Sequence, residues 1–562
     1  MNVSDVPILS IITFLPLIGA VLVAILPATA ARPIALGVAL VTWVVSLLLL
    51  IGYLPGREGA QFQYVEVADW IPIFGIQYKL GVDGLSAALV VLTTTLTWIC
   101  ILASWKPIQT RIKEYMVAFL VLEVGLIGVF LALDLFLFYI FWEIVLVPMY
   151  LIIGIWGGAN RIYATIKFVL YTLVGSLLML VAILATGFAY QAAHGGSWVG
   201  AFDFENLVAF AASPAGGFAP ALQIGAFLAF FLAFAIKVPM FPFHTWLPDA
   251  HTEAPTAGSV ILAGVMLKLG AYGLMRFALP LFPDAAQTFA PAIIVLSLIA
   301  IIYGAIVALV QPDLKRLVAY SSVSHMGFVT LGLFVFTEQG VQGAVLQMIN
   351  HGLITGALFL LVGVIYERTH DRTIAKMGGL AGRTPVYAAL FGFFVFASAG
   401  LPGLSGFVGE FLTLVGTFEV SPPAAAIATF VMILAAGYLL YMYGRIVFGE
   451  LSDFLAGLGD HLTDIQPIEI LTLVPLATLV VVFGIQPGLL LDLIDGSVDA
   501  TLAAAASGIA FEVSGTLVVA GIVLVVAGVA ARILWVLARH GDAGSAPRGA
   551  GTAPAAEGGG AH

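Results

Sequence analysis

Apolar runs of about twenty residues follow one another from one end of the chain to the other, separated by short polar connections. Each run is long enough to cross roughly 30 Å of hydrocarbon as an α-helix. The period-2 alternation of membrane β-barrel strands is absent. The pattern therefore predicts about fifteen membrane-spanning helices, near residues 8–27, 34–54, 84–105, 115–132, 134–156, 162–191, 220–246, 256–280, 288–310, 314–336, 341–366, 386–418, 424–448, 467–490 and 513–538.

Two blocks of five predicted helices look alike, because each places an interrupted helix fourth. KVPMFP interrupts the first block and AGLPGLSGFVGE the second, with Pro239, Pro242 and Pro402 as the helix breakers. Proline and glycine are common in membrane helices, but two breaks at matching positions, each beside an ionisable residue, favour an ion path in inverted repeats. We therefore expect an N-terminal three-helix segment (1–110), two five-helix repeats (111–285 and 286–450), helix fourteen (451–500), an extra C-terminal helix (501–540) and a disordered tail (541–562).

Composition narrows the class of protein. The 562 residues are 61% hydrophobic and 9% charged, with a mean hydropathy of +1.11, which excludes a soluble domain. The single cysteine, Cys100, excludes an internal disulfide and a cluster held by several thiolates. Neither a Walker A motif nor a dinucleotide-binding glycine motif occurs in the sequence. We expect an all-α polytopic protein in a lipid bilayer, with no nucleic-acid partner and with no cofactor or metal of its own.

Basic residues collect at alternate connections, those that follow odd-numbered spans. The opposite connections carry few, so the positive-inside rule places the N-terminus outside the cytoplasm. The first apolar run lacks a basic leading region and a small-residue cleavage site, and we interpret it as a retained helix. The basic residues that set this orientation are Arg32, Lys106, Arg111, Lys113, Arg161, Lys315, Arg316, Arg368, Arg372, Lys376, Arg383 and Arg445.

Five ionisable residues lie inside predicted spans: Glu123, Glu143, Lys237, Lys268 and Glu410. Each costs about 2.5–3.5 kcal/mol at the bilayer centre, or roughly 10–15 kcal/mol for the set. That sum is comparable with the whole stability of an ordinary domain, which favours a function such as a proton path. The free energy of opening and closing a Glu–Lys contact has a suitable magnitude for loading and releasing a proton. Three pKa units on a lysine correspond to about 4 kcal/mol, and a proton crossing about 150–200 mV carries about 3.5–4.6 kcal/mol. Static ion pairs that fix helix packing remain the alternative.

Histidines add candidates for a relay. His325 lies in SSVSHMG and His351 in MINHGLITG, both at membrane depth, although a lone histidine on a helix is more often a hydrogen-bonded packing residue. A third group lies in the loop after the first break and superficially offers metal ligands: His244, Asp249, His251 and Glu253. It lacks the i,i+4 spacing of a helical zinc site, so we favour loop structure over a metal site.

Several long stretches resemble the antiporter-like subunits of respiratory complex I, the proton-translocating NADH:quinone oxidoreductase. They are KVPMFPFHTWLPDAHTEAPTAGS from Lys237, VILAGVMLKLGAYGLMRF directly after it, QPDLKRLVAYSSVSHMG from Gln311, WEIVLVPMYLIIGIWG from Trp142 and GLPGLSGFVGEF from Gly400. The resemblance covers roughly residues 80–450. It implies a fourteen-helix bundle with two inverted five-helix repeats and with broken helices seven and twelve.

The resemblance also implies roles for single residues. Glu143 matches a helix-five glutamate that pairs with the helix-seven lysine, Lys237. Lys268 matches the central lysine of a hydrophilic axis. The remaining matches are His325 and His351 for the histidines that lead onward from that lysine, Glu410 for the terminal residue on helix twelve, and Glu123 for a second carboxylate on helix four. Glutamate at 410, where related subunits carry lysine, is typical of the subunit M branch of the family.

The expected function follows from the same resemblance. It implies a proton-translocating membrane-arm subunit in the bacterial inner membrane, with paired half-channels and with other antiporter-like subunits as neighbours. FMN, iron–sulfur clusters and quinone would lie in other subunits, so this chain would perform no redox chemistry itself. A subunit of a multisubunit cation/proton antiporter and a subunit of a membrane-bound hydrogenase remain alternatives. The predicted fifteenth helix and tail depart from the family pattern, which usually ends after helix fourteen.

Overall fold

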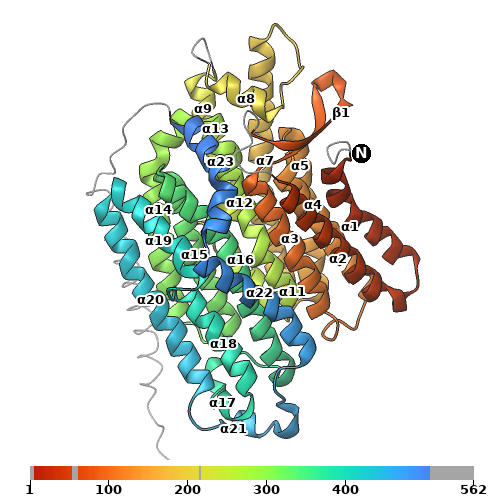
Figure 1. Ribbon diagram of the computed structural model, residues 1–562, viewed down its shortest axis with the longest axis vertical. Coiled ribbons are helices and arrows are strands. Elements are labelled where there is room, and N and C mark those ends of the chain that lie inside the picture. The colour runs from red at the N-terminus through yellow and green to blue at the C-terminus, as the bar shows by residue number, and fades with distance from the viewer. Residues whose placement is uncertain (1–5, 54–60, 214–216, 507–562) are drawn as a thin grey trace, which may run out of the picture.

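The computed structural model describes residues 6–53, 61–213 and 217–506 and shows a tall bundle of helices (Figure 1). Thirteen helical segments in the described part of the chain are long and apolar enough to cross a membrane, and Pro385–Ser398 is a shorter apolar helix. The prediction of an all-α polytopic bundle is therefore confirmed. The predicted last span, 513–538, and the predicted tail lie outside the described residues.

The helices follow the predicted runs closely, with most boundaries within a few residues. The first part of the chain contains α1 (Ile8–Ile25), α2 (Ala28–Gly52), α3 (Gly84–Ala103), α4 (Ile112–Leu131), α5 (Leu135–Ile144), α6 (Leu146–Trp156), α7 (Arg161–Ala193), α8 (Phe204–Ala211), α9 (Pro220–Lys237) and α10 (Trp246–Glu253). One span, Thr256–Leu281, then contains α11 (Thr256–Ile261), η3 (Leu262–Met266), α12 (Leu267–Gly273), η4 (Leu274–Ala278) and α13 (Leu279–Leu281).

The second part of the chain continues the bundle. Its long helices are α14 (Pro283–Leu309), α15 (Leu314–Phe334), α16 (Glu338–Thr369), α18 (Pro385–Ser398), α19 (Ser405–Val420), α20 (Pro422–Val447), α22 (Pro467–Ile485) and α23 (Gly488–Ala505). Short turns of helix lie between them: η5 (Ile374–Lys376), α17 (Leu380–Arg383), α21 (Asp453–Ala456) and η6 (Gly459–His461).

Polar residues at the helix starts explain where several spans begin. Asp83 caps α3 by accepting a hydrogen bond from the Ser86 N–H over 2.9 Å, and Asp313 caps α15 by accepting from the Arg316 N–H over 2.9 Å. Asp134 caps α5 in the same way. An N-cap side chain satisfies backbone donors that the helix itself leaves free. These carboxylates therefore mark the ends of spans and carry no evidence for a proton path by themselves.

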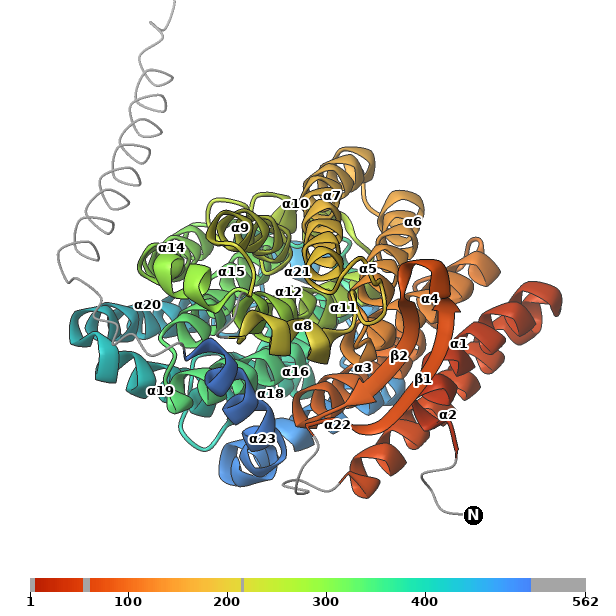
Figure 2. The same ribbon diagram turned by 90° about the horizontal axis from the view of Figure 1, so that it is seen from above.

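Burial distinguishes the centre of the bundle from its rim. The apolar windows of the Thr256–Leu281 span and of α16 are completely buried, whereas less than half of the residues in those of α1, α2, α20 and α22 are buried. Seen from above, α12 and α16 lie inside the molecule, with α1 and α2 at one edge and α20 at the other (Figure 2). Lys268 on α12 and His351 on α16 are therefore shielded from both lipid and water.

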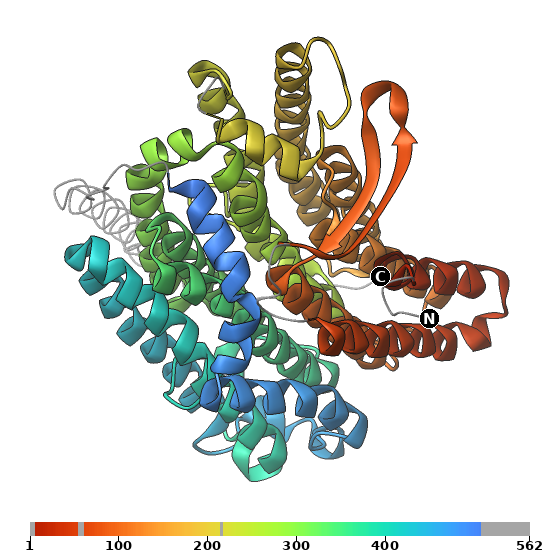
Figure 3. The same cartoon turned by 45° about the horizontal axis from the view of Figure 1, so that its top comes forward.

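One end of the bundle carries elements that the hydropathy pattern did not predict (Figure 3). Strands β1 (Gln63–Ile71) and β2 (Ile76–Val82) form an antiparallel hairpin around η2 (Pro72–Phe74), in the segment predicted as a polar connection. Helix α8 and much of α23 were also not predicted, since one helix was expected in 451–500. We call this the hairpin end, and the end that carries α17 and α21 the loop end.

Candidate functional site

Lys237 is the last residue of a membrane-spanning helix. α9 ends at Lys237, and turns separate it from α10, which begins at Trp246. Pro239 and Pro242 lie in these turns, and a proline removes a backbone donor and clashes with the preceding helical turn. The indole Nε1 of Trp246 donates to the Ile236 carbonyl over 2.8 Å. That bond satisfies a carbonyl at the helix end, so the interruption has a stable geometry.

The side chain of Lys237 is 1% exposed and lies among aromatic rings. Its Nζ is 5.2 Å from the ring centroid of Trp142 and 5.7 Å from that of Phe168, which is cation–π geometry. Glu143 follows Trp142 on α5, and its charge acts on that of Lys237. No ion pair within 4.0 Å joins the two among the described residues, and one oxygen of Glu143 is buried without a hydrogen bond. The structure thus places the two charges near each other without direct contact.

Lys268 lies at the centre of the bundle and is fully buried. It is the second residue of α12, directly after the π-helical turn η3, a distortion frequently found at functional sites. Its Nζ donates to the Ala263 carbonyl in η3 over 2.5 Å. It also lies 2.7 Å from Nδ1 of His351 on α16, so that nitrogen can accept a proton from the ammonium group.

A row of polar groups continues from His351 across the bundle. The rings of His351 and His325 lie 6.0 Å apart. On α15, Nδ1 of His325 is 2.7 Å from Oε1 of Glu410, which lies on α19. The same carboxylate oxygen accepts a hydrogen bond from Gln347 over 3.0 Å. Lys268, both histidines and Glu410 are each less than 5% exposed, so four predicted site residues form one buried row.

A small cavity of about 10 Å³ lies along this row, with Ser398 among its lining residues. Both histidines, Gln347 and Glu410 also line it. A volume of that size is near the lower limit for one water molecule, and its lining offers several hydrogen-bonding partners. The gap between the two imidazole rings can therefore be bridged by a single ordered water.

Two other predicted features lie apart from this row. Glu123 on α4 is fully buried, and neither of its carboxylate oxygens has a hydrogen-bond partner in the described structure. Pro402 lies between the end of α18 and the start of α19. Gly400 and Gly403 flank it at φ of 78° and 94°, in the left-handed region that favours glycine. The interpretation of both breaks as matching features of two repeats stays a prediction.

His251 is a candidate that we had interpreted as part of a structural loop. It lies in α10, is fully buried, and neither ring nitrogen has a hydrogen-bond partner in the described structure. Its ring stacks on Phe359 at 4.7 Å, and the charges of Lys268 and Lys315 both act on it. Its neighbour Asp249 does have a structural role, since it pairs with lysine and arginine side chains of α7 and α15. His251 is buried because α10 lies inside the bundle, and the sequence pattern alone does not predict that position.

Lys315 connects this region with a cavity at the loop end. The residue is 5% exposed, and its Nζ donates to the carbonyl of Ala254. It lines a cavity of about 430 Å³, together with Glu253 and Arg372. Polar atoms contribute about half of the cavity wall. A cavity lined by charged side chains therefore reaches buried Lys315, whose charge acts on His251.

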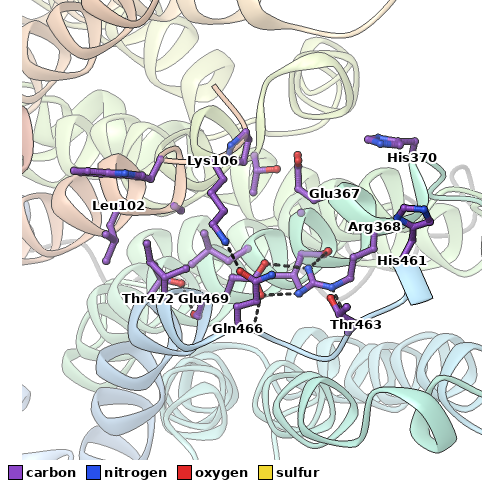
Figure 4. A pocket seen from close by; sticks show the side chains of 18 of the residues that line it. Leu102, Lys106, Glu367, Arg368, His370, His461, Thr463, Gln466, Glu469 and Thr472 are labelled. Atoms are coloured by element: carbon purple, nitrogen blue, oxygen red, sulfur yellow. Dashed lines mark hydrogen bonds and ion pairs between the residues drawn. The ribbon is translucent and has the colours of Figure 1, made fainter. Parts of the chain in front are cut away.

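A second cavity of about 610 Å³ lies beside the first and shares Glu367 with it (Figure 4). In this cavity Arg368 forms an ion pair of 2.8 Å with Glu469, and Lys106 donates to Gln466. These bonds connect the start of α22 to the end of α16 and to the connection after α3. No group of three or more His, Cys, Asp or Glu residues is placed to hold a metal ion within the described ranges.

Comparisons with known proteins agree with this geometry. The profile of the family described as "NADH:quinone oxidoreductase/Mrp antiporter, TM" matches residues 132–436. The chain is 51% identical over 506 residues to NADH-quinone oxidoreductase subunit M of Rhodobacter capsulatus, which covers 87% of this chain and 95% of that protein. The chain belongs to the subunit M family of NADH-quinone oxidoreductases. The antiporter-like membrane subunits that the sequence motifs resemble are therefore its relatives.

Chains of solved membrane complexes have the same fold as this chain. A chain of respiratory complex I from Thermus thermophilus, solved with bound NADH, has a TM-score of 0.78 and 32% identity, covering 88% of this chain and 99% of that chain. A chain of the Mrp complex from Dietzia sp. has a TM-score of 0.72 and 22% identity, covering 96% of this chain and 60% of that chain. The second likeness concerns the fold alone.

Proposed function

We propose that this chain is a proton-translocating membrane-arm subunit of a bacterial NADH:quinone oxidoreductase, and that its buried row of charges carries the protons. The observation that carries the proposal is the pair of 2.7 Å contacts, from Lys268 to His351 and from His325 to Glu410, on either side of a small polar cavity. Proton transfer needs donor and acceptor atoms at about 2.6–3.2 Å or one intervening water. Two of the three steps meet that distance directly, and the third has the small polar cavity.

The order of groups suggests how a proton crosses the centre of the chain. Nζ of Lys268 gives its proton to Nδ1 of His351, and the imidazole releases a proton from Nε2, which has no partner in the described structure. A water in the shared cavity would pass it to His325. Nδ1 of His325 then delivers a proton to the carboxylate of Glu410. Each histidine thus receives on one nitrogen and releases from the other.

The other half of the path begins at Lys237. Its helix end lies directly against α12, since a Cβ on Gly270 would come within 2.6 Å of the carbonyl oxygen of Phe234. Glu143 is close enough to influence Lys237 but is not paired with it, as expected for one state of a contact that opens and closes. We propose that closing this contact loads Lys237, and that opening it passes the proton toward Lys268. Each five-helix unit, 111–285 and 286–450, would then contribute one half-channel.

Orientation and partners complete the proposal. The loop end carries most basic connections, so we assign it to the cytoplasm and the N-terminus to the opposite side of the inner membrane. The 430 Å³ cavity, with Lys315 and His251, would supply protons from the cytoplasm to the segment between Lys237 and Lys268. The driving redox chemistry, with FMN, iron–sulfur clusters and quinone, would reside in partner subunits beside other antiporter-like membrane subunits. A cation/proton antiporter is disfavoured by glutamate at 410, where the resemblance associates lysine with antiporter subunits.

The experiment that tests this function is Lys237→Ala in the assembled complex. NADH-driven acidification of inverted membrane vesicles should fall strongly, because the proton has no loading site at the helix end. The amount of assembled complex and its NADH oxidation with an artificial electron acceptor should stay near those of the parent. Full acidification by an assembled Lys237→Ala complex would refute the proton path.

A further inference from the structure

A second buried cation lies on the same span as Lys268, toward the hairpin end. Arg276 in η4 is 2% exposed and forms an ion pair with Asp83, the N-cap residue of α3. Lys268, Tyr272 and Arg276 follow one another at intervals of four residues. This spacing places successive side chains near one face of a helix. The span therefore continues its line of polar groups from the central lysine toward the hairpin end.

The surroundings of Arg276 are sealed by aromatic rings. Its guanidinium carbon lies 5.0 Å from the ring centroid of Phe62, 5.4 Å from that of Tyr272 and 5.9 Å from that of Phe204. Phe62 directly precedes β1 and Phe204 begins α8, so elements of the hairpin end close over the ion pair. The planar guanidinium suits such stacking.

The hydrogen bonds of Arg276 lead to groups that cannot accept a proton and pass it onward. The guanidinium has five donors and no acceptor, and it does not deprotonate in proteins. Its Nε donates to the hydroxyl of Tyr272 over 3.3 Å, and that hydroxyl donates to the carbonyl of Phe130 over 2.9 Å. A backbone carbonyl passes no proton onward. Among the described residues, Asp83 is the carboxylate in contact with this group, and it accepts hydrogen bonds from Arg276, from the Ser86 N–H and from the Ser497 hydroxyl.

The two directions from Lys268 therefore differ. Toward the loop end lie His251 and Lys315, both titratable groups, and then a polar cavity of about 430 Å³. Toward the hairpin end lie a tyrosine whose proton is committed, a guanidinium that cannot accept one, and a ring of aromatic side chains. Among the described residues, a proton on Lys268 has titratable neighbours without hydrogen-bond partners on the loop-end side, such as His251. On the hairpin-end side, Tyr272 and Asp83 are already hydrogen-bonded, and Tyr53 is a further titratable group that interacts electrostatically with Asp83.

We propose that Arg276 and Asp83 form a proton plug, which prevents a proton on Lys268 from leaving directly through the hairpin end. The plug forces lateral transfer to His351, and so toward Glu410. This inference rests on the proposed function, because it assigns Arg276 a positioning role for the route that starts at Lys268. The plug requires a side chain at position 276 that stays protonated and that remains paired with Asp83.

The test replaces Arg276 by groups that differ in proton chemistry. Arg276→His keeps a side chain that can pair with Asp83 but accepts and releases protons, so it should raise passive proton conductance severalfold per assembled complex. NADH-driven acidification should fall accordingly. Arg276→Gln leaves Asp83 free as an acceptor and should leak, whereas adding Asp83→Asn should close that leak.

Two controls separate a plug from a merely structural ion pair. Adding Lys268→Met to Arg276→His should abolish the leak, since the leak must start at Lys268. Lys79→His makes the same type of change in a buried pair at the same end, Lys79 with Asp203, and should cause no leak. An assembled Arg276→His complex with unchanged conductance would overturn the plug, and so would a leak that persists without Lys268.

The outcomes also distinguish this inference from the proposed function. If Lys268→Met alone leaves NADH-driven pumping unchanged, the proposed proton route fails, whatever Arg276 does. If Lys268→Met stops pumping while Arg276→His stays tight, only the plug is wrong. Because Arg276→His preserves the pairing partner of Asp83, a tight or leaky result can be measured even where Arg276→Gln does not assemble.

Discussion

The contact between His325 and Glu410 allows a quantitative prediction for Glu410→Gln. The amide is nearly the same size as the carboxylate, so packing on α19 and assembly should be preserved. What is lost is a 2.7 Å charge-assisted hydrogen bond in a buried site. Such bonds contribute about 1.5–3 kcal/mol, which corresponds to a roughly 10- to 150-fold change in the equilibrium constant for forming the contact. Proton transfer at the end of the row should then limit pumping.

The assay compares initial rates of NADH-driven acidification in inverted membrane vesicles, normalised to the amount of assembled complex. Glu410→Gln should reduce that rate at least tenfold, as the roughly 10-fold lower bound of the hydrogen-bond loss requires. Gln347→Leu removes a weaker bond of 3.0 Å to the same oxygen and should give an intermediate rate. Glu419→Gln, on the exposed face of the same helix, is the matched control and should pump normally. Wild-type pumping by assembled Glu410→Gln would refute the role of this contact.

Three further predictions concern other parts of the chain. Glu143→Gln should reduce acidification to the level of Lys237→Ala, because Lys237 would lose the charge that loads it; wild-type acidification would make Glu143 a bystander. His251→Gln should slow pumping while leaving NADH oxidation with an artificial acceptor intact, because the route from the loop-end cavity would lose its titratable group; an unchanged acidification rate would return His251 to a packing role. Truncation after Ser507 should leave assembly and quinone reduction unchanged on native gels and in turnover assays, and loss of the assembled complex would identify the removed segment as a docking element.

Much of the fold was predictable because membrane-spanning helices are recognisable in the sequence as long apolar runs. The hairpin β1–β2 was not, since its strands lie between two apolar runs and carry charges such as Glu66, Asp69 and Lys79. Helix α23 was missed for a similar reason: Asp492, Asp495 and Asp499 interrupt its apolar pattern. Both elements lie at the hairpin end, where tertiary contacts rather than the bilayer decide the structure.

The candidate site was predictable only in part. The cost of burying charge pointed to Lys268 and Glu410, and the structure places both in one row with His325 and His351. Glu123 satisfied the same criterion, yet it has no hydrogen-bond partner in the described structure, because burial cost says nothing about neighbours.

His251 and Arg276 show the opposite error. The sequence pattern predicted a structural loop at His251 and gave no role to Arg276, whereas the structure buries both. The positions of these two side chains depend on α10 and the Thr256–Leu281 span entering the core together. Hydropathy along a single segment carries no information about such an arrangement.

The most direct test of proton transfer along the buried row is the number of protons translocated per NADH by the complex with Lys268→Met. Methionine fills a similar volume without a titratable group, so assembly should be retained and NADH oxidation with an artificial acceptor should be normal. With Lys268 removed, His351 has no lysine donor at 2.7 Å, and the number of protons per NADH should fall well below that of the parent complex. An assembled Lys268→Met complex that translocates as many protons per NADH as the parent would contradict a path through this row.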